Sequence, residues 1–236
     1  MAEELKMRIV RTTLLAIACG AAASTANAAL VVYEDFESVP LGTPPVQLAS
    51  GFLTAGGPGG GGSPVAPTIS IVSPGLSGSN QGYQAVHGTG NFNYNGDIPF
   101  DTLINLDPAN PIVEVTARYV REDPGTGTYN TLRLIGNTNV SSLGSYSQIG
   151  SDLSLGSSGA TVTGSWDLTA YIASLTLTPV GPYNNLRFVL NKNGNGTGTL
   201  VIDNIRYQAI PEPSALALFA LSGCLLTRRR RQLSTM

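Results

Sequence analysis

The sequence contains few of the residues on which redox, thiolate and imidazole chemistry depend. Only two of its 236 residues are cysteines, Cys19 and Cys224, and both lie inside apolar terminal segments. The region between those segments has no cysteine and one histidine, His87. These counts exclude a disulfide framework and a thiolate-bound metal in the central region. They also exclude a zinc site built from several histidines.

Positive charge is scarce in the middle of the chain. Charged residues make up 12% of the sequence, and positions 29–210 carry six basic residues against twelve acidic ones. Binding to a phosphate backbone requires a basic face, which this region lacks. We therefore expect no nucleic-acid partner.

Short catalytic motifs are missing as well. No Gly-x-Ser-x-Gly sequence occurs that could present a nucleophilic serine, and no GK[ST] follows the glycine-rich stretch at 55–64. A serine–histidine–acid triad would have to use His87, without the motif or the fold that normally carries it. We therefore predict that the chain is not an enzyme.

The residues that are abundant favour strands over helices. The chain has 28 glycines and 15 prolines, which disfavour long helices. Alternating apolar and polar residues predict strands, and these segments are 30–37, 112–120, 129–135, 186–190 and 199–207. Glycine- and asparagine-rich clusters at 123–127 and 191–198 predict hairpin connections, and 55–64 predicts a flexible loop. Together they predict an all-β domain at 29–209, an antiparallel β-sandwich of the jelly-roll type.

The N-terminus has the three-part layout of a secretory signal peptide. Arg8 and Arg11 precede an apolar stretch from Leu14, which ends in the small residues Ala26 and Ala28. We predict a signal peptide at 1–28 that enters the secretion translocon and is cut by signal peptidase after Ala28. Cys19 leaves a lipoprotein alternative open, although Ala16 stands where a lipobox normally has leucine.

The C-terminus combines a short motif, an apolar segment and a basic cluster. The order is Pro211, Glu212 and Pro213, then the apolar residues 214–227, then Arg228, Arg229, Arg230 and Arg231. Fourteen residues span about 21 Å as a helix, against about 30 Å for the hydrocarbon core, so this transmembrane helix needs local thinning or snorkelling. The arginines are expected to stay cytoplasmic, which places the domain across the inner membrane.

This C-terminal segment, 210–231, resembles the PEP-CTERM sorting tail of Gram-negative bacteria that make exopolysaccharide. The resemblance implies that an exosortase, a membrane-embedded transpeptidase, removes the helix and passes the protein to the cell surface or extracellular matrix. A permanent tail anchor has the same hydropathy but does not explain Pro211 and Pro213. Both interpretations predict export.

The domain also resembles galactose-binding-like jelly rolls, the architecture of many carbohydrate-binding modules. The resemblance rests on an opening Glu34–Glu37, a central Ser165–Thr169 and a closing Leu200–Tyr207. It implies that the first and last strands lie side by side and share a structural calcium ion, with Glu37 and Asp203 at the ligand positions. Trp166, and tyrosines in general, could offer flat faces to sugar rings or belong to the core.

Two hypotheses about function follow. The first is an exported cell-envelope or extracellular-matrix protein, processed through its sorting tail and associated with exopolysaccharide. The alternative is a carbohydrate-binding module that recognises a specific glycan through its aromatic side chains. Neither hypothesis requires a cofactor. A calcium ion would be structural, and the alternative is that Glu37 and Asp203 are solvated or turn-forming acids.

Overall fold

A computed structural model describes residues 29–58, 66–88, 92–122, 130–139, 146–156, 158–176, 184–192 and 197–210. The predicted signal peptide with Ala26 and Ala28, and the sorting tail from Pro211 to Arg231, lie outside these ranges. Both predictions therefore stay predictions. Within the described residues, no helix is long and apolar enough to cross a bilayer.

Eleven strands, one short 3-10 helix and one α-helix make up the described part of the domain. The strands are β1 (Ala29–Glu34), β2 (Leu53–Pro58), β3 (Thr68–Val72), β4 (Gly82–His87), β5 (Phe92–Pro99), β6 (Ile112–Arg121), β7 (Asn130–Asn137), β8 (Tyr146–Ser154), β9 (Ser158–Asp167), β10 (Asn185–Lys192) and β11 (Gly198–Ala209). The helices are η1 (Phe100–Thr102) and α2 (Thr169–Thr176). The first four residues of the predicted loop at 55–64 belong to β2.

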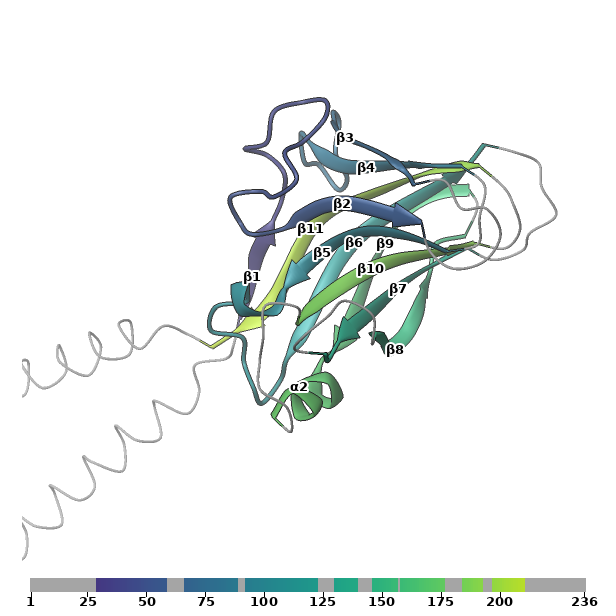
Figure 1. Ribbon diagram of the computed structural model, residues 1–236. Coiled ribbons are helices and arrows are strands. Elements are labelled where there is room, and N and C mark those ends of the chain that lie inside the picture. The colour runs from purple at the N-terminus through teal and green to yellow at the C-terminus, as the bar shows by residue number, and fades with distance from the viewer. Residues whose placement is uncertain are drawn as a thin grey trace, which may run out of the picture. The chain divides into compact units, whose positions relative to one another are not determined.

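The strands form two sheets that face each other (Figure 1). Sheet A has the order β3-β4-β11-β6-β9, with β1 also paired to β11, and sheet B has the order β2-β5-β10-β7-β8. The pairings that link β2 through β11 are antiparallel. From β4 onward the two sheet orders are those of an eight-stranded jelly roll. The predicted antiparallel β-sandwich is confirmed, as is the pairing of its first and last strands.

The prediction that segments 123–127 and 191–198 form hairpin connections was wrong. Segment 123–127 lies between β6 in sheet A and β7 in sheet B, and 193–197 lies between β10 in sheet B and β11 in sheet A. Each therefore joins strands of different sheets. Glycine and asparagine permit a tight reversal, but they do not decide whether the next strand pairs with the previous one or crosses the sandwich.

The core consists of the inward-facing residues of both sheets. Phe36, Phe52 and Tyr83 form an aromatic cluster with ring centroids 5.7 to 5.8 Å apart. Trp166 of sheet A lies against Phe188 of sheet B, with centroids 6.1 Å apart. These rings bridge the two layers, and burying them supplies much of the hydrophobic stabilisation of the sandwich.

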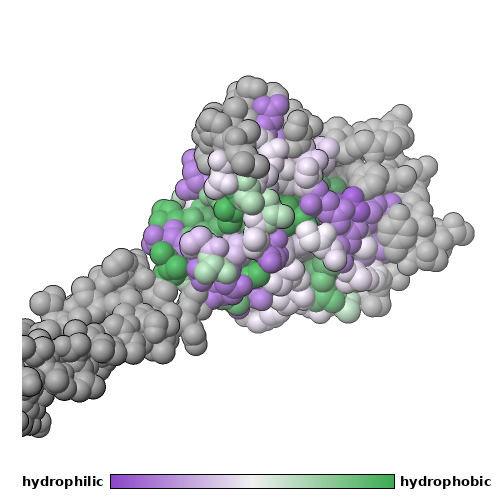
Figure 2. Space-filling model, turned by 90° about the horizontal axis from the view of Figure 1, so that it is seen from below, coloured by the Kyte–Doolittle hydropathy of each residue, from purple (hydrophilic) through white to green (hydrophobic). Residues whose placement is uncertain are grey.

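The surface around α2 is mixed in character. Seen from below, described hydrophobic residues form small patches between hydrophilic ones (Figure 2). Exposed aliphatic side chains elsewhere include Leu30 and Val32 of β1 and Ile104 after η1. Single exposed aliphatic side chains of this kind are common on protein surfaces.

Candidate functional site

The outer face of sheet B carries two groups of polar and aromatic side chains. On its central strand β10, Leu186, Phe188 and Leu190 are fully buried in the core. Because successive side chains alternate across a strand, Asn185 and Arg187 project to the opposite side of the sheet. The side chains that surround Arg187 on this face come from β5 and β8 as well as from β10.

Arg187 is enclosed by two tyrosines. The guanidinium carbon lies 4.6 Å from the ring centroid of Tyr94 on β5 and 4.7 Å from that of Tyr146 on β8. Both distances are within cation–π range. The arginine side chain is 15% exposed, so part of the stack reaches solvent. We call Tyr94, Arg187 and Tyr146 the tyrosine–arginine stack.

A carboxylate and an amide hold this stack in place. Arg187 donates two hydrogen bonds to Asp97, through Nε and Nη2, each 2.5 Å long. Asn185 donates to the same carboxylate, and its own Oδ1 accepts a 3.2 Å bond from the Tyr146 hydroxyl. Burial raises the pKa of Asp97, while the hydrogen bonds and charge of Arg187 act in the opposite direction. The bidentate geometry fixes the plane of the guanidinium.

A β-bulge brings Tyr94 and Asp97 to the same face. They are three residues apart, so strict alternation would place them on opposite sides of β5. The register slips between the pairs Arg187–Asp97 and Val189–Tyr94, where Asn95 and Gly96 lie opposite the single residue Phe188, so β5 has one extra residue. Gly96 has φ +94°, and a Cβ there would meet the Phe52 ring at 2.4 Å. Only glycine suits this position.

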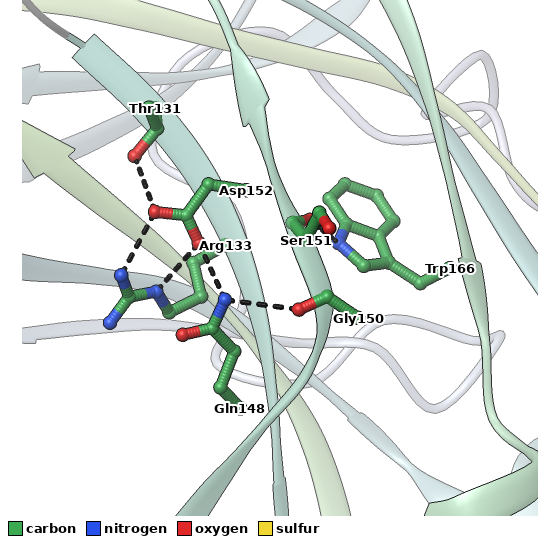
Figure 3. A network of polar contacts seen from close by, with 7 residues as sticks. All are labelled: Thr131, Arg133, Gln148, Gly150, Ser151, Asp152 and Trp166. Atoms are coloured by element: carbon green, nitrogen blue, oxygen red, sulfur yellow. Dashed lines mark hydrogen bonds and ion pairs between the residues drawn. The ribbon is translucent and has the colours of Figure 1, made fainter.

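A second polar network lies on the same face, on β7 and the edge strand β8 (Figure 3). Arg133 donates to both oxygens of Asp152, at 2.8 and 2.9 Å. Thr131 and Gln148 add bonds of 3.1 and 2.9 Å to the same carboxylate. Hydrogen bonding from Arg133 is the main cause that lowers the pKa of Asp152. We call Thr131, Arg133, Gln148 and Asp152 the β8 network.

This network sits on another bulge. Three residues of β8, Gly150 to Asp152, lie opposite the single residue Arg133 of β7. Gln148 donates a 3.0 Å bond to the Gly150 carbonyl from the outer side. Trp166 donates a 3.0 Å bond to the Ser151 carbonyl from the core side. The bulged segment is thus held from both sides (Figure 3).

The sequence left Trp166 as either a ligand for sugar rings or a core residue, and the structure contradicts the ligand alternative. Its side chain is 2% exposed and faces the core, where it contacts Phe188 and supports the β8 bulge. A sugar ring therefore cannot stack on it, and the core interpretation of this residue is the one that fits. Of the tyrosines, Tyr83 is also buried in the core, whereas Tyr94 and Tyr146 lie on the candidate face.

Glu37 and Asp203 bind the same turn. Glu37 accepts hydrogen bonds from the backbone N–H of Asn80, at 2.7 Å, and of Gln81, at 3.2 Å. Asp203 is fully buried and accepts from the N–H of Leu76, at 2.7 Å. Burial raises the pKa of Asp203, and the charge of Glu37 adds to the rise. Both carboxylates are therefore bound to the backbone of residues 76–81.

One further oxygen makes this region fit a calcium ion. The buried Oε1 of Gln81 has no hydrogen-bond partner among the described residues, while its Nε2 donates to the Glu37 carbonyl. Two carboxylates and an amide oxygen are the hard ligands that Ca²⁺ takes. The described residues contain no group of three or more His, Cys, Asp or Glu side chains, so amide and backbone oxygens would have to complete the set.

His87, the one histidine of the sequence, is 1% exposed on β4. Its side chain faces the core rather than a cleft. The prediction that the chain is not an enzyme remains a prediction.

No family model matches the chain, and no curated protein matches it either. Similar solved structures include the CBM22-1 xylan-binding domain of Xyn10C from Paenibacillus barcinonensis, with 9% identity, 78% of this chain and 98% of that domain covered, and a TM-score of 0.46. Another is the family 11 carbohydrate-binding module of Lic26A-Cel5E from Clostridium thermocellum, with 14% identity, coverage of 78% and 97%, and a TM-score of 0.43. A carbohydrate-binding module of family 28, specific for non-crystalline cellulose, has 13% identity, coverage of 76% and 94%, and a TM-score of 0.49. These likenesses are too distant to assign a function, which has to come from the chain's own side chains.

Proposed function

We propose that the domain binds a polysaccharide on the outer face of sheet B. The observation that carries the proposal is the tyrosine–arginine stack, in which two aromatic rings are fixed around a guanidinium on a face lined with amides and carboxylates. Sugars present apolar C–H faces beside hydroxyl edges, so a site for them combines aromatic surface with hydrogen-bonding groups. Both are present here.

The site is also rigid before any ligand arrives. Asp97 and Asn185 anchor Arg187 and Tyr146, so a ligand does not have to order these side chains. Preorganisation lowers the entropic cost of binding, which matters for a weakly interacting ligand such as a glycan. Binding of this kind needs no catalytic group.

The test is affinity electrophoresis of the full chain, purified in detergent, through gels that contain individual polysaccharides. Tyr94→Ala and Tyr146→Ala are each expected to weaken binding by about tenfold, or about 1.4 kcal/mol. Val86→Ala and Val120→Ala, at exposed positions on the other sheet, are the matched controls and should migrate as the wild type. Retardation that survives the loss of both tyrosines would place the binding surface elsewhere.

We further propose that the chain is exported and processed through its PEP-CTERM-like tail, and that glycan binding is how it is retained in the exopolysaccharide matrix. The support is the order of Pro211–Pro213, the apolar segment 214–227 and Arg228–Arg231. Intact mass spectrometry of the protein from its host should give a chain that begins at Ala29 and ends near Pro213. A variant with alanine at 211, 212 and 213 should keep its arginines in the inner membrane. If both proteins keep the full C-terminus, the segment is a plain anchor.

Calcium binding at Glu37 and Asp203 is part of the same proposal. The ion would relieve the repulsion between the two carboxylates and engage Gln81 Oε1. Since Glu37 follows β1 and Asp203 lies in β11, such an ion would tie the first and last strands together. Its role would be structural.

A further inference from the structure

A pocket of about 250 Å³ opens beside the candidate face, at the edge of sheet B. It lies between β8 and α2, and its lining includes Ser147, Gln148, Asp167, Ala170, Tyr171 and Ser174. Because β8 is the outermost strand of sheet B, no further strand separates the pocket from the outer face. Neither the tyrosine–arginine stack nor the proposed calcium site uses this space.

Gln148 belongs to both the pocket and the face. It is one of the residues that line the pocket, and its Nε2 donates to Asp152 and to the Gly150 carbonyl in the β8 network (Figure 3). On the opposite wall, the Asp167 carboxylate is fixed by 2.8 and 2.6 Å bonds from the N–H and hydroxyl of Thr169. Two side chains with hydrogen-bonding capacity are thus held at the pocket before a ligand enters.

The size and chemistry of the pocket suit one sugar ring. Sites for drug-sized ligands span about 300–1,000 Å³, so this pocket falls just below the range and is too small for several sugar rings. The Ser147 hydroxyl and the Asp167 carboxylate offer partners to sugar hydroxyls, and Ala170 and Tyr171 supply apolar surface. The Ser174 hydroxyl donates to the Tyr171 carbonyl, so it can offer a ligand only its oxygen as an acceptor. None of the lining residues is a lysine or arginine. The single charge is negative, which disfavours a uronate or a sulfated sugar.

The pocket lies where a polysaccharide that crosses the outer face of sheet B would end. From β5, which bears Tyr94, to β8 is three strand spacings, or about 14 Å. A polysaccharide that stacks on the tyrosines and runs toward β8 reaches Gln148 at the sheet edge. A sugar that branches from it at that point can turn over the edge into the pocket.

We propose that this pocket holds a single neutral sugar branch, and that the ligand of the domain is therefore a branched, neutral polysaccharide. This inference rests on the proposed glycan binding of sheet B. It adds a preference for branched over unbranched glycans, which the outer face of sheet B alone does not supply. Gln148 would contact the ligand where the main chain and the branch meet.

The experiment compares galactomannan with unbranched mannan, and xyloglucan with amorphous cellulose, using the full chain in detergent. The wild type should bind the branched member of a pair about tenfold more tightly, as one or two extra hydrogen bonds allow. Ala170→Trp, which fills the pocket, should abolish this preference and leave binding to the unbranched glycan unchanged. Ala173→Trp is the control, because it is an exposed alanine of the same helix outside the pocket lining.

The outcomes separate the two proposals. Equal binding of branched and unbranched glycans by the wild type, or a preference that persists in Ala170→Trp, overturns the branch pocket and leaves the face intact. Binding that Tyr94→Ala and Tyr146→Ala leave unchanged, or no binding to any of the four glycans, counts against the glycan-binding proposal itself. If Ala170→Trp does not fold, Ser147→Trp at an exposed position of β8 fills the same space.

Discussion

Arg187 shows how much of the candidate site depends on individual residues far apart in the sequence. Its carboxylate partner Asp97 is 90 residues away in the sequence, and its two aromatic neighbours come from different strands. Arg133 and Asp152 repeat the same bidentate pairing nearby. Both arginines of the described face are therefore charge-compensated, and the face presents planar, oriented groups rather than net charge.

Asp152 leads to a prediction about pH. Its pKa is lowered in the folded state, chiefly by Arg133, from an unfolded value of about 3.9. The resulting stabilisation is therefore present above about pH 4 and is lost as the pH falls through the lowered folded value. Asp152→Asn should reduce the free energy of unfolding at pH 7 and flatten its decline between about pH 4 and pH 2.

Urea unfolding at several pH values measures this effect. Asp101→Asn, at an exposed aspartate, is the control and should follow the wild type. The same acid-induced decline in Asp152→Asn as in the wild type would show that the Arg133–Asp152 pair adds no stability.

At the level of elements, the β8 bulge links the core to the candidate face. Trp166 supports the bulge from within, and Gln148 and Asp152 project from it on the outer side. A substitution of Trp166 in the core can therefore alter the outer face of sheet B, although Trp166 is not part of that face.

Trp166→Phe tests this coupling. It keeps an aromatic ring against Phe188 but removes the bond to the Ser151 carbonyl, so we expect a loss of about 1–3 kcal/mol in stability. It should also weaken glycan binding, because the bulge is no longer held from the core side. Tyr207→Phe is matched to it, since it removes a 2.5 Å bond to the Ile104 carbonyl away from the bulge. Equal glycan affinity in both variants, despite similar losses of stability, would refute the coupling.

The proposed calcium ion acts between elements too. Millimolar Ca²⁺ should raise the thermal midpoint of the wild type. At a hundredfold excess over the dissociation constant, the bound ion adds about 2.7 kcal/mol to the free energy of unfolding. Glu37→Gln should lose this response, whereas Glu122→Gln, at an acid outside the proposed site, should keep it. Differential scanning calorimetry with Ca²⁺, Mg²⁺ or EDTA measures the shift. A midpoint that is indifferent to all three would remove the ion from the proposal.

At the scale of the whole molecule, the charge distribution predicts how binding responds to salt. The central region is acidic, and the arginines of the candidate face are paired with carboxylates. Binding of a neutral glycan releases no counterions, so its affinity should change by less than about twofold between 50 and 500 mM NaCl. Titration calorimetry at the two salt concentrations tests this. A steep loss of affinity would indicate a polyanionic ligand.

The sequence by itself determined the local features. Alternating side chains located several strands, because a half-buried strand requires a two-residue period. The charge segregation and the two terminal segments predicted export, since those signals are linear in the chain. Glu37 and Asp203 came instead from the resemblance to galactose-binding-like jelly rolls; the structure brings their side chains to one turn, and the calcium site stays a prediction.

Only the tertiary structure decided which residues share a face. Tyr94 and Asp97 project to the same side because a bulge at Gly96 resets the alternation, and no periodicity reveals where a register slips. The segments 123–127 and 193–197 join different sheets because pairing depends on strands elsewhere in the chain. The sequence left both the core and the surface open for Trp166, since an aromatic residue can serve in either. Its burial was settled by the opposing sheet that covers it.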